Sequence, residues 1–257
     1  MLTAPELERY ARQIVLSEIG GPGQQALKRA RILLIGAGGI GSPAALYLAA
    51  AGVGTLGLVD DDAVSLSNLQ RQILFSSEDV GRPKVDAAAE RLDRLNGHTM
   101  VERHHRRIAR HDGHDLVQGY DLVIDGSDNF ATRYVMADLC EAAGRPLVSA
   151  AVQRFAGQVT TLTPFASRPD GTPCPAYRDL FPAAPPAGMV PSCAEAGILG
   201  VVTGILGTLA ATEAIKLVCG IGEPLVGRLL HFDALTLRFE ETRYRRSSRP
   251  GPSPSSD

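Results

Sequence analysis

The sequence lacks the features that define several large classes of proteins. Only four of its 257 residues are cysteine, and no two of them form a CxxC pair, so we expect neither a disulfide framework nor a zinc site of the usual paired spacing. The charges nearly cancel, at a formal net charge of −2, and this balance does not indicate nucleic acid or an anionic membrane as a partner. We interpret the short basic stretches at 102–107 and 243–246 as a solvated face or a chain end. These absences leave a globular enzyme as the expected class.

Apolar runs long enough to cross a membrane are also missing. The first residues, MLTAPELERYARQ, contain charges and no apolar segment of the kind that a secretory signal needs. The most apolar stretch, residues 196–212, is followed by Glu213 and is shorter than the roughly 20 residues of a membrane span. Because it is rich in glycine, alanine and threonine, it predicts a buried core helix over 197–218. We therefore expect a cytoplasmic protein.

Apolar strands and helical patterns alternate through the first half of the chain. This βαβ repetition predicts a Rossmann-like, mostly parallel sheet with flanking helices. In the helix expected near 83–96, apolar residues recur at intervals of three and four, so one of its faces is expected to be buried. Strands are expected at 31–36, 55–60, 99–103, 120–126 and 146–152, and helices at 40–51, near 83–96 and near 129–143.

The second half shows a different pattern. Residues 157–165 predict a strand that turns back, and 225–232 and 234–241 predict two more, so the sheet should end in antiparallel strands. A proline-rich loop over 166–191 separates them, and so long a loop in a compact domain is usually functional or mobile. The tail, 247–257, lacks apolar residues and is expected to be disordered. We expect one domain over 1–246, made of an N-terminal helical segment (1–29), a nucleotide-binding core (30–152) and an elaboration (153–246).

A glycine-rich turn follows the first strand. In GAGGIGS (36–42), Gly36, Gly38 and Gly41 fit the G-x-G-x-x-G pattern, in which backbone N–H groups and a helix N-terminus meet phosphate or ribose. Gly39 belongs to the same turn, and Asp60 is placed to bind ribose hydroxyls. The alternative is that the glycines serve only the tight packing of strand and helix. The pattern favours nucleotide binding without choosing between NAD, FAD and ATP.

Two polar segments near this turn favour a triphosphate. SLSNLQRQILF (65–75) and GRPKVDAA (81–88) place Asn68, Arg71 and Lys84 beside the acid for the ribose. A neutral nicotinamide has little use for such a cluster, whereas arginine provides a planar fork and lysine a point charge for the β- and γ-phosphates. Either charge alone would be an ordinary surface residue, so it is the cluster that favours ATP.

A third segment, GSDNFATR (126–133), follows the strand that ends at Asp125. Asp125 and Asp128 are expected at the carboxyl end of a parallel strand, where such sheets bind ligands. Asp128 is a candidate for holding Mg²⁺ on the phosphates, because a hard cation prefers carboxylate oxygen. The alternative is an N-cap, with Ser127 or Asp128 leading the next helix.

Together these segments resemble the HesA/MoeB/ThiF family, the bacterial relatives of ubiquitin-activating enzymes. The similarity runs from RYARQI (9–14) through GAGGIGS, LVDDDAVSLSNLQRQ, GRPK, DGSDN and SCAEAGILG (192–200) to GRLLHFDALT (227–236), and SLSNLQRQ is more specific than the glycine turn. The resemblance implies an adenylyltransferase that uses ATP and Mg²⁺. Its substrate would be the C-terminal Gly-Gly carboxylate of a small ubiquitin-like sulfur-carrier protein, and pyrophosphate would be released.

The resemblance also implies roles for individual residues. Asp60 would bind ribose, and Asp128 would serve Mg²⁺ or its water. Arg12 would reach into the ATP site of a partner subunit, so a homodimer is expected, with residues 153–246 contributing to the carrier and dimer surfaces. The catalytic candidates are Arg71, Lys84, Asp128, Arg12 and Cys193, and the nucleotide-binding candidates are Gly36, Gly38, Gly39, Gly41, Asp60, Asp62, Asn68, Arg71, Gln72, Lys84, Asp128 and Asn129.

The chain departs from the family at its zinc site. Many members bind a structural zinc through one CxxC in a CYRC stretch and another near the C-terminus, but here PAYRDLFP (175–182) has Ala176 and Asp179 in the two cysteine places. The C-terminal pair has no counterpart, and Cys174 alone cannot make a tetrahedral site. We predict no zinc, with the loop and the C-terminus either tied by packing or mobile.

Cys193, in SCAEAG, has two interpretations. It precedes the expected core helix, whose N-terminus favours a thiolate, and in ThiF-like relatives a cysteine here can form a covalent link to the activated carrier. It is alternatively a buried structural thiol. Because the chain stops without a rhodanese-like extension, we expect the sulfur donor to be a separate protein, a cysteine desulfurase or a rhodanese.

Two alternatives to the adenylyltransferase remain open at this point. An NAD(P)-dependent oxidoreductase is favoured only by the glycine turn and Asp60, and binding of ATP without NAD would exclude it. A non-catalytic scaffold is suggested by the missing zinc cysteines. Among the carriers, those of thiamine, molybdopterin and other pathways are all compatible, because the surface of the carrier and not the ATP site determines that choice.

Overall fold

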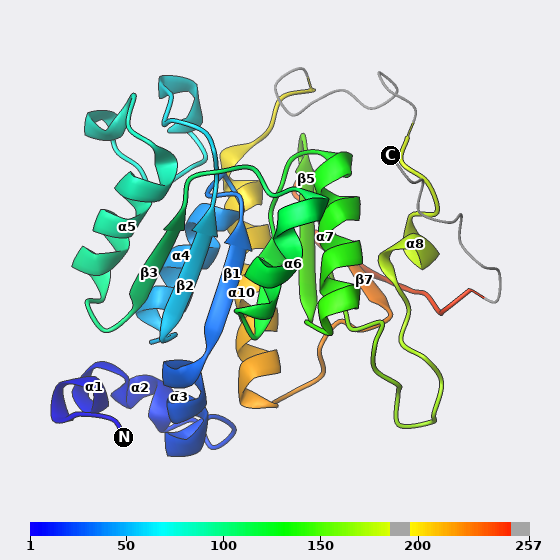
Figure 1. Ribbon diagram of the computed structural model, residues 1–257, viewed down its shortest axis with the longest axis horizontal. Helices are drawn as coiled ribbons and strands as arrows, with labels where there is room; N and C mark the ends of the chain where they lie inside the picture. The colour runs from blue at the N-terminus through cyan, green and yellow to red at the C-terminus, as the bar shows by residue number, and fades with distance from the viewer. Residues whose placement is uncertain (186–195, 248–257) are drawn as a thin grey trace.

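The computed structural model describes residues 1–185 and 196–247, which form an eight-stranded sheet with helices on both faces (Figure 1). The strands lie in the order β3-β2-β1-β4-β5-β6-β7-β8. Strands β1 to β5 pair in parallel, and β6 to β8 are antiparallel to their neighbours, which confirms the predicted fold class. Their bounds are β1 (Arg31–Ile35), β2 (Thr55–Val59), β3 (Met100–His104), β4 (Leu122–Asp125), β5 (Leu147–Gln153), β6 (Ala156–Leu162), β7 (Arg228–Asp233) and β8 (Arg238–Arg243).

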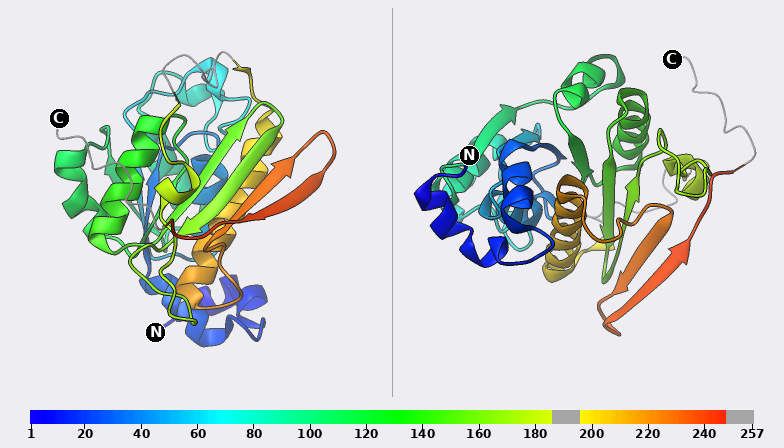
Figure 2. Two further views of the ribbon diagram at one scale, coloured as in Figure 1. Left: turned by 90° about the vertical axis from the view of Figure 1, so that its right-hand side faces the viewer. Right: turned by 90° about the horizontal axis from the view of Figure 1, so that it is seen from below.

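The helices form two layers, one on each face of the sheet. Ile32 and Leu34 of β1 are buried with residues of α3, α4, α5 and α10, whereas Leu33 and Ile35 are buried with residues of α6, α7 and α8. This division follows from the alternation of side chains along a strand. Figure 2 shows the β7–β8 hairpin at the outer edge of the sheet. The helices are α1 (Ala4–Arg9), α2 (Ala11–Ile14), α3 (Gly20–Arg29), α4 (Gly41–Ala50), α5 (Lys84–Leu95), α6 (Arg110–Gln118), α7 (Phe130–Ala143), α8 (Tyr177–Leu180) and α10 (Gly200–Cys219), with 3₁₀ turns η1 (Leu66–Asn68) and η2 (Ser77–Asp79).

Helix α10 corresponds to the long apolar helix predicted over 197–218. Its residues Val202, Leu206, Ala210 and Ala214 are fully buried against α4 and strands β4 to β6, while Val201 is exposed. By length and composition alone this helix could cross a membrane. A helix with one face buried against a sheet and one face exposed is instead typical of a globular α/β protein, so the prediction of burial holds for one face of α10.

Helix α7 begins at a different cap from those considered in the sequence. Asn129 is the N-cap, and its Oδ1 accepts a hydrogen bond from the backbone N–H of Thr132 at 2.9 Å. The alternative in which Ser127 or Asp128 leads the helix is therefore wrong. As a result, the Asp128 carboxylate is not used to start α7.

The short helix α8 lies within the loop expected over 166–191, and helix α6 was also not evident from the sequence pattern. Helix α6 connects β3 to β4 and packs beside α7, but only Gly113 and Val117 are buried, so it has no apolar stripe to reveal it. Residues 248–257 of the predicted disordered tail, residues 186–191 of the proline-rich loop and the following residues 192–195 lie outside the described residues.

Candidate active site

A cavity of about 790 Å³ opens at the carboxyl ends of the parallel strands. The register places Ile35 at the end of β1 level with Val59 of β2 and with Asp125 of β4. Because the connections to β2 and to β4 pass on opposite faces of the sheet, a crevice remains where they diverge. Thr203 of α10 lines the cavity from one side.

The glycine turn forms the floor of this cavity. Gly36 has φ +87°, a conformation that other residues rarely adopt. A side chain on Gly41 would place its Cβ only 1.9 Å from the carbonyl oxygen of Gly36, whereas a Cβ on Gly38 would meet nothing closer than the Gln72 amide nitrogen at 3.8 Å. Gly41 is thus required by packing, and Gly38 leaves bare backbone facing the cavity.

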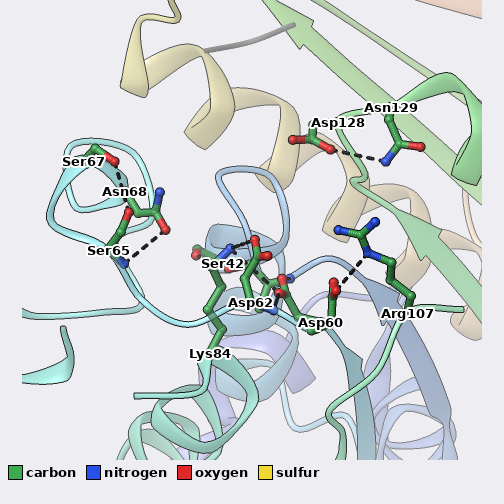
Figure 3. Close-up of polar contacts among 12 residues, drawn as sticks. Ser42, Asp60, Asp62, Ser65, Ser67, Asn68, Lys84, Arg107, Asp128 and Asn129 are labelled. Atoms are coloured by element: carbon green, nitrogen blue, oxygen red, sulfur yellow. Dashed lines mark hydrogen bonds and ion pairs between the residues drawn. The ribbon is translucent and has the colours of Figure 1, made fainter. Parts of the chain in front are cut away.

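Asp60 and Lys84 form a partly buried pair beside the turn (Figure 3). The carboxylate of Asp60 accepts hydrogen bonds from the N–H groups of Ala37, at 2.8 Å, and Asp62, at 2.9 Å. The Lys84 Nζ, at the start of α5, lies 2.7 Å from Asp62 Oδ2 and 3.8 Å from Asp60 Oδ1, and its side chain is only 5% exposed. Burial raises the pKa of Asp60, while Lys84 and the two N–H groups act in the opposite direction. The acid is fixed to the glycine turn and the lysine is held beside it.

The segment that follows η1 contributes Arg71 and Gln72. Arg71 Nη1 donates to the carbonyl oxygen of Ser67 at 3.0 Å, and Asn68 Oδ1 accepts from the N–H of Ser65 at 3.4 Å. Gln72 is buried and lines the cavity, yet its Oε1 has no hydrogen-bond partner within the described chain. An unpaired buried carbonyl oxygen is costly in free energy, so Gln72 retains the capacity to accept one more hydrogen bond.

Asp128 differs from the other acids of the cavity. It is exposed, and its Oδ1 accepts only a long hydrogen bond from Asn129 Nδ2, at 3.4 Å (Figure 3). Asp60, Asp61 and Asp62 are the one group of three potential metal ligands in residues 1–185 and 196–247, but Lys84 contacts Asp60 and Asp62, and Arg107 lies 2.8 Å from Asp61. Among the described cavity residues, Asp128 is therefore the carboxylate with no cationic partner, and it fits a hard metal ion.

Three cationic residues of the cavity, Arg106, Arg107 and Arg133, were missed in the sequence. Arg106 and Arg107 belong to the stretch 102–107, and the interpretation of that stretch as a solvated face holds for Arg107, whose side chain is 83% exposed, although both residues also line the cavity. Arg106 pairs with Asp112 at 2.7 Å. The position of Arg106 and Arg107 just beyond β3, a parallel strand, was the available signal.

The structure brings most of the predicted nucleotide-binding residues together. Arg12 lies on α2, among the N-terminal helices at the far end of the sheet from the cavity (Figure 1), and it does not line the cavity of its own chain. Gly41 packs behind the turn, and Cys193 lies outside the described residues. The lining residues among those predicted are Gly36, Gly38, Gly39, Asp60, Asp62, Asn68, Arg71, Gln72, Lys84, Asp128 and Asn129.

Ala176, the N-cap of α8, and Asp179, within α8, occupy the two places at which the resemblance to the family predicted cysteines. Asp179 Oδ2 accepts the N–H of Ala176 at 2.7 Å, and Oδ1 accepts the N–H of Ser247 at 2.8 Å. Arg246 donates to the carbonyl oxygen of Cys174 at 3.3 Å, and its Nε lies 3.8 Å from Asp179 Oδ2. These five residues, which we call the α8 clamp, tie α8 to the chain that follows β8.

The α8 clamp does not fit a zinc ion. Ala176 offers no ligand atom, and both carboxylate oxygens of Asp179 accept backbone hydrogen bonds, so four ligands cannot be assembled from these residues. The stretch 243–246 was interpreted as a solvated face or a chain end, and Arg246 is exposed but also binds the segment around α8. Up to Ser247, the loop and the C-terminal segment are tied by polar packing.

The fold and the cavity together define a nucleotide-binding protein of the Rossmann class, whose cavity is lined by cationic side chains and by one carboxylate without a cationic partner among the described residues. Comparison with known families narrows this class. The model of the ThiF family matches residues 10–251, and the chain belongs to this family.

Relatives and solved structures agree with this assignment. The chain is 48% identical over 244 residues to the SAMP-activating enzyme E1 of Haloferax volcanii, with 95% of this chain and 87% of that protein covered. It is 47% identical over 247 residues to the sulfur carrier protein adenylyltransferase of Thermus thermophilus, with 96% and 90% covered. The structure of E. coli MccB with MccA-N7isoASN has a TM-score of 0.81 at 22% identity, covering 93% of this chain and 73% of that one, and it shows the fold alone.

Proposed function

We propose that the protein uses Mg·ATP to adenylate the C-terminal Gly-Gly carboxylate of a small ubiquitin-like sulfur-carrier protein and releases pyrophosphate. The observation that supports this most directly is the cavity itself, where Asp60, Lys84, Arg71 and Asp128 surround the glycine turn in a ThiF-family chain. Two relatives at 47–48% identity are named for sulfur-carrier adenylation and for activation of SAMP. An oxidoreductase has no comparable support.

The reaction requires the protein mainly to position the two substrates and to neutralise the charge of the phosphates. A carboxylate oxygen of the carrier attacks the α-phosphorus, the bond from that phosphorus to the bridging oxygen breaks, and pyrophosphate leaves. The carboxylate is already a nucleophile, so no general base is needed. Asp60 would accept the ribose hydroxyls, and Arg71, Lys84 and Asn68 would donate to the phosphate chain as negative charge shifts toward the leaving group.

Magnesium would bind on the Asp128 side of the cavity. This carboxylate has no cationic partner within the described chain, in contrast to the acids that contact Lys84 and Arg107. When bound, the ion neutralises phosphate charge and orients the pyrophosphate as a leaving group. Asp128 would hold the ion or its water, and the neighbouring Asn129 is already used as the N-cap of α7.

We propose a homodimer in which Arg12 completes the site of the partner subunit. Arg12 is exposed on α2, and the neighbouring apolar side chains Val15 and Leu16 are also exposed, which favours contact with another chain. If the sites are shared, mixing Arg12→Ala with Lys84→Ala protein should restore activity, because each mixed dimer contains one intact site. Random exchange of subunits would give about a quarter of wild-type activity. No recovery after verified exchange would contradict the shared site.

Location and the later sulfur step are part of the same proposal. The need for ATP and the free thiols of Cys140, Cys174 and Cys219 favour the cytoplasm. The sulfur donor would be a separate protein, a cysteine desulfurase or a rhodanese. The identity of the carrier would determine whether the sulfur is used for thiamine, molybdopterin or another product. A covalent role for Cys193 is tested by mass spectrometry of the trapped carrier adduct with and without Cys193→Ala.

Carrier-dependent ATP–pyrophosphate exchange tests the whole proposal. We expect exchange with a carrier that ends in Gly-Gly, and a loss of about 100-fold or more in Arg71→Ala and Lys84→Ala. Arg91→Ala, which removes an exposed arginine of α5 outside the cavity lining, is the matched control and should keep full activity. Absence of exchange with all candidate carriers, in protein that binds ATP, would favour the non-catalytic scaffold.

A further inference from the structure

Two buried charged residues lie directly beneath the loop that contains Asp128. Asp125, the last residue of β4, is fully buried, and Arg133, in the second turn of α7, is 8% exposed. Burying a charged side chain costs free energy. Neither side chain is needed to complete the sheet or to cap α7, because Asn129 provides the cap. Their burial therefore needs another explanation.

Both residues bind the backbone of Ser127, the residue before Asp128. The N–H of Ser127 donates to Asp125 Oδ1 at 2.9 Å, and the carbonyl oxygen of Ser127 accepts from Arg133 Nη2 at 2.8 Å. The backbone of Ser127 is thus fixed on both sides, from a strand below and from a helix beside it. A charge-assisted hydrogen bond is stronger and more directional than a neutral one, so these contacts restrict how the next residue can turn.

The opposite charges of Asp125 and Arg133 also interact with each other. Burial raises the pKa of Asp125, and the positive charge of Arg133 opposes this effect. The Arg133 guanidinium lies 5.3 Å from the centre of the Phe130 ring, which further limits its movement. Ser127, Asp128 and Arg133 all line the cavity.

We propose that Asp125 and Arg133 are positioning residues, which hold the loop 126–129 so that the Asp128 carboxylate faces the bound phosphates and metal. This inference rests on the proposed function, because it assigns Asp128 to Mg·ATP. Neither residue reacts. They restrict the Asp128 carboxylate to the orientation that the reaction uses, and a displacement of about 1 Å can cost on the order of 100-fold in rate.

Four variants and two controls test the proposal. Asp125→Ala and Arg133→Met remove the contacts to Ser127, whereas Asp125→Asn and Arg133→Lys keep an acceptor or a donor. The controls are Asp121→Ala, which removes an acceptor for the Arg31 N–H just before β4, and Arg145→Met, which removes a donor to the Gln118 carbonyl oxygen beyond the other end of α7.

The first measurement is amide hydrogen exchange of residues 126–129 in the free protein, which needs neither ATP nor a carrier. We expect exchange of the Ser127 N–H, which donates to Asp125 in the wild type, to be at least about 10-fold faster in Asp125→Ala and Arg133→Met, and unchanged in both controls. Unchanged exchange in the test variants would overturn the proposal. If amide hydrogen exchange is faster in the test variants but the wild-type protein shows no adenylation, the positioning role stands and only the proposed function is overturned.

The second measurement is ATP–pyrophosphate exchange at several Mg²⁺ concentrations. Asp125→Ala and Arg133→Met should lower kcat by about 10- to 100-fold and raise the Mg²⁺ concentration needed for half-maximal rate, with a smaller change in the KM for ATP. Asp125→Asn and Arg133→Lys should recover most of the loss. In a protein that already contains Asp128→Ala, adding Asp125→Ala should lower kcat only slightly further. The reason is that the effects of two substitutions are not additive when one residue acts through the other. A full additive loss, or a loss equal to that of the controls, would overturn the proposal.

Discussion

Asp179 is the residue on which the α8 clamp depends, and Asp179→Ala tests whether the clamp stabilises the protein without a metal. The substitution removes the acceptor for the Ala176 N–H, the acceptor for the Ser247 N–H and the ionic contact with Arg246. The first two are short bonds to a carboxylate that is only 10% exposed. After folding, both N–H groups would be left without this partner, so the loss falls on the native state.

The expected loss follows from these contacts. Replacing a capping side chain by alanine costs about 1 kcal/mol, and a second hydrogen bond to a charged acceptor adds about 1–2 kcal/mol. We expect the free energy of unfolding to fall by about 2–3 kcal/mol, which lowers the Tm of a chain of this size by about 4–12 °C. The 3.8 Å contact with Arg246 adds little at that distance.

Thermal unfolding with and without a chelator is the assay. Asp170→Ala is the matched control, because Asp170 accepts hydrogen bonds from Thr172 within its own exposed turn and does not join two segments, so its Tm should match that of wild type. The chelator should leave the Tm of every protein unchanged. One equivalent of bound zinc in the wild type, together with a Tm that falls on chelation, would refute the reasoning. So would an Asp179→Ala protein as stable as the wild type.

The remaining predictions concern the glycine turn and two acids. Gly41→Ala should lower the free energy of unfolding by about 3 kcal/mol, because the new Cβ would meet the Gly36 carbonyl oxygen at 1.9 Å. Gly38→Ala should keep the stability of the protein but weaken ATP binding in calorimetry. The reverse result would contradict the assignment of Gly41 to packing and of Gly38 to the approach of the ligand. Burial raises the pKa of Asp60, and its ionised form is the proposed ribose acceptor. ATP affinity measured by calorimetry should therefore fall on acidification at a pH above the usual range of an aspartate, and this pH dependence should be absent in Asp60→Asn. A hydrogen bond from Lys28, the positive charge of Lys28 and the hydrogen bonds from Thr3 together lower the pKa of Glu6 from 4.5 to about 2. A lowered folded-state pKa stabilises the protein above the unfolded value and loses this effect as the pH falls, so the Tm difference between wild type and Glu6→Gln should be full above pH 4.5 and vanish toward pH 2; a constant difference would argue against this pair.

The sheet was predictable because its signals are local. The strand over 31–36 and the helix stripe near 83–96 follow from short apolar patterns, and the order of strands and helices predicts a parallel core. The same reasoning failed for α6, since a helix with only Gly113 and Val117 buried leaves no apolar period in the sequence. Arg106 and Arg107 were missed for a related reason: a charge after a strand looks the same in the sequence whether it faces solvent or a cavity.

The roles of individual polar side chains depended on contacts between distant segments. Asp128 could be an N-cap or a ligand from its sequence context, and only the observed bond between Asn129 and Thr132 separates these roles. The clamp joins Asp179 to Ser247, 68 residues away. Such pairs have no fixed spacing in the chain, so no pattern in the sequence predicts them.

The sequence by itself determined the strand–turn–helix unit, the set of acids and cations near it, and the resemblance to an adenylating family, because each depends on residues close together in the chain. Tertiary structure alone decided which of these charges are paired. Lys84 and Arg107 contact three neighbouring aspartates, while Asp128 keeps an unpaired carboxylate above a Ser127 backbone fixed by Asp125 and Arg133. The physical reason is that the strength of a charge at a site depends on its distance to other charges and on its burial, and both are properties of the folded chain.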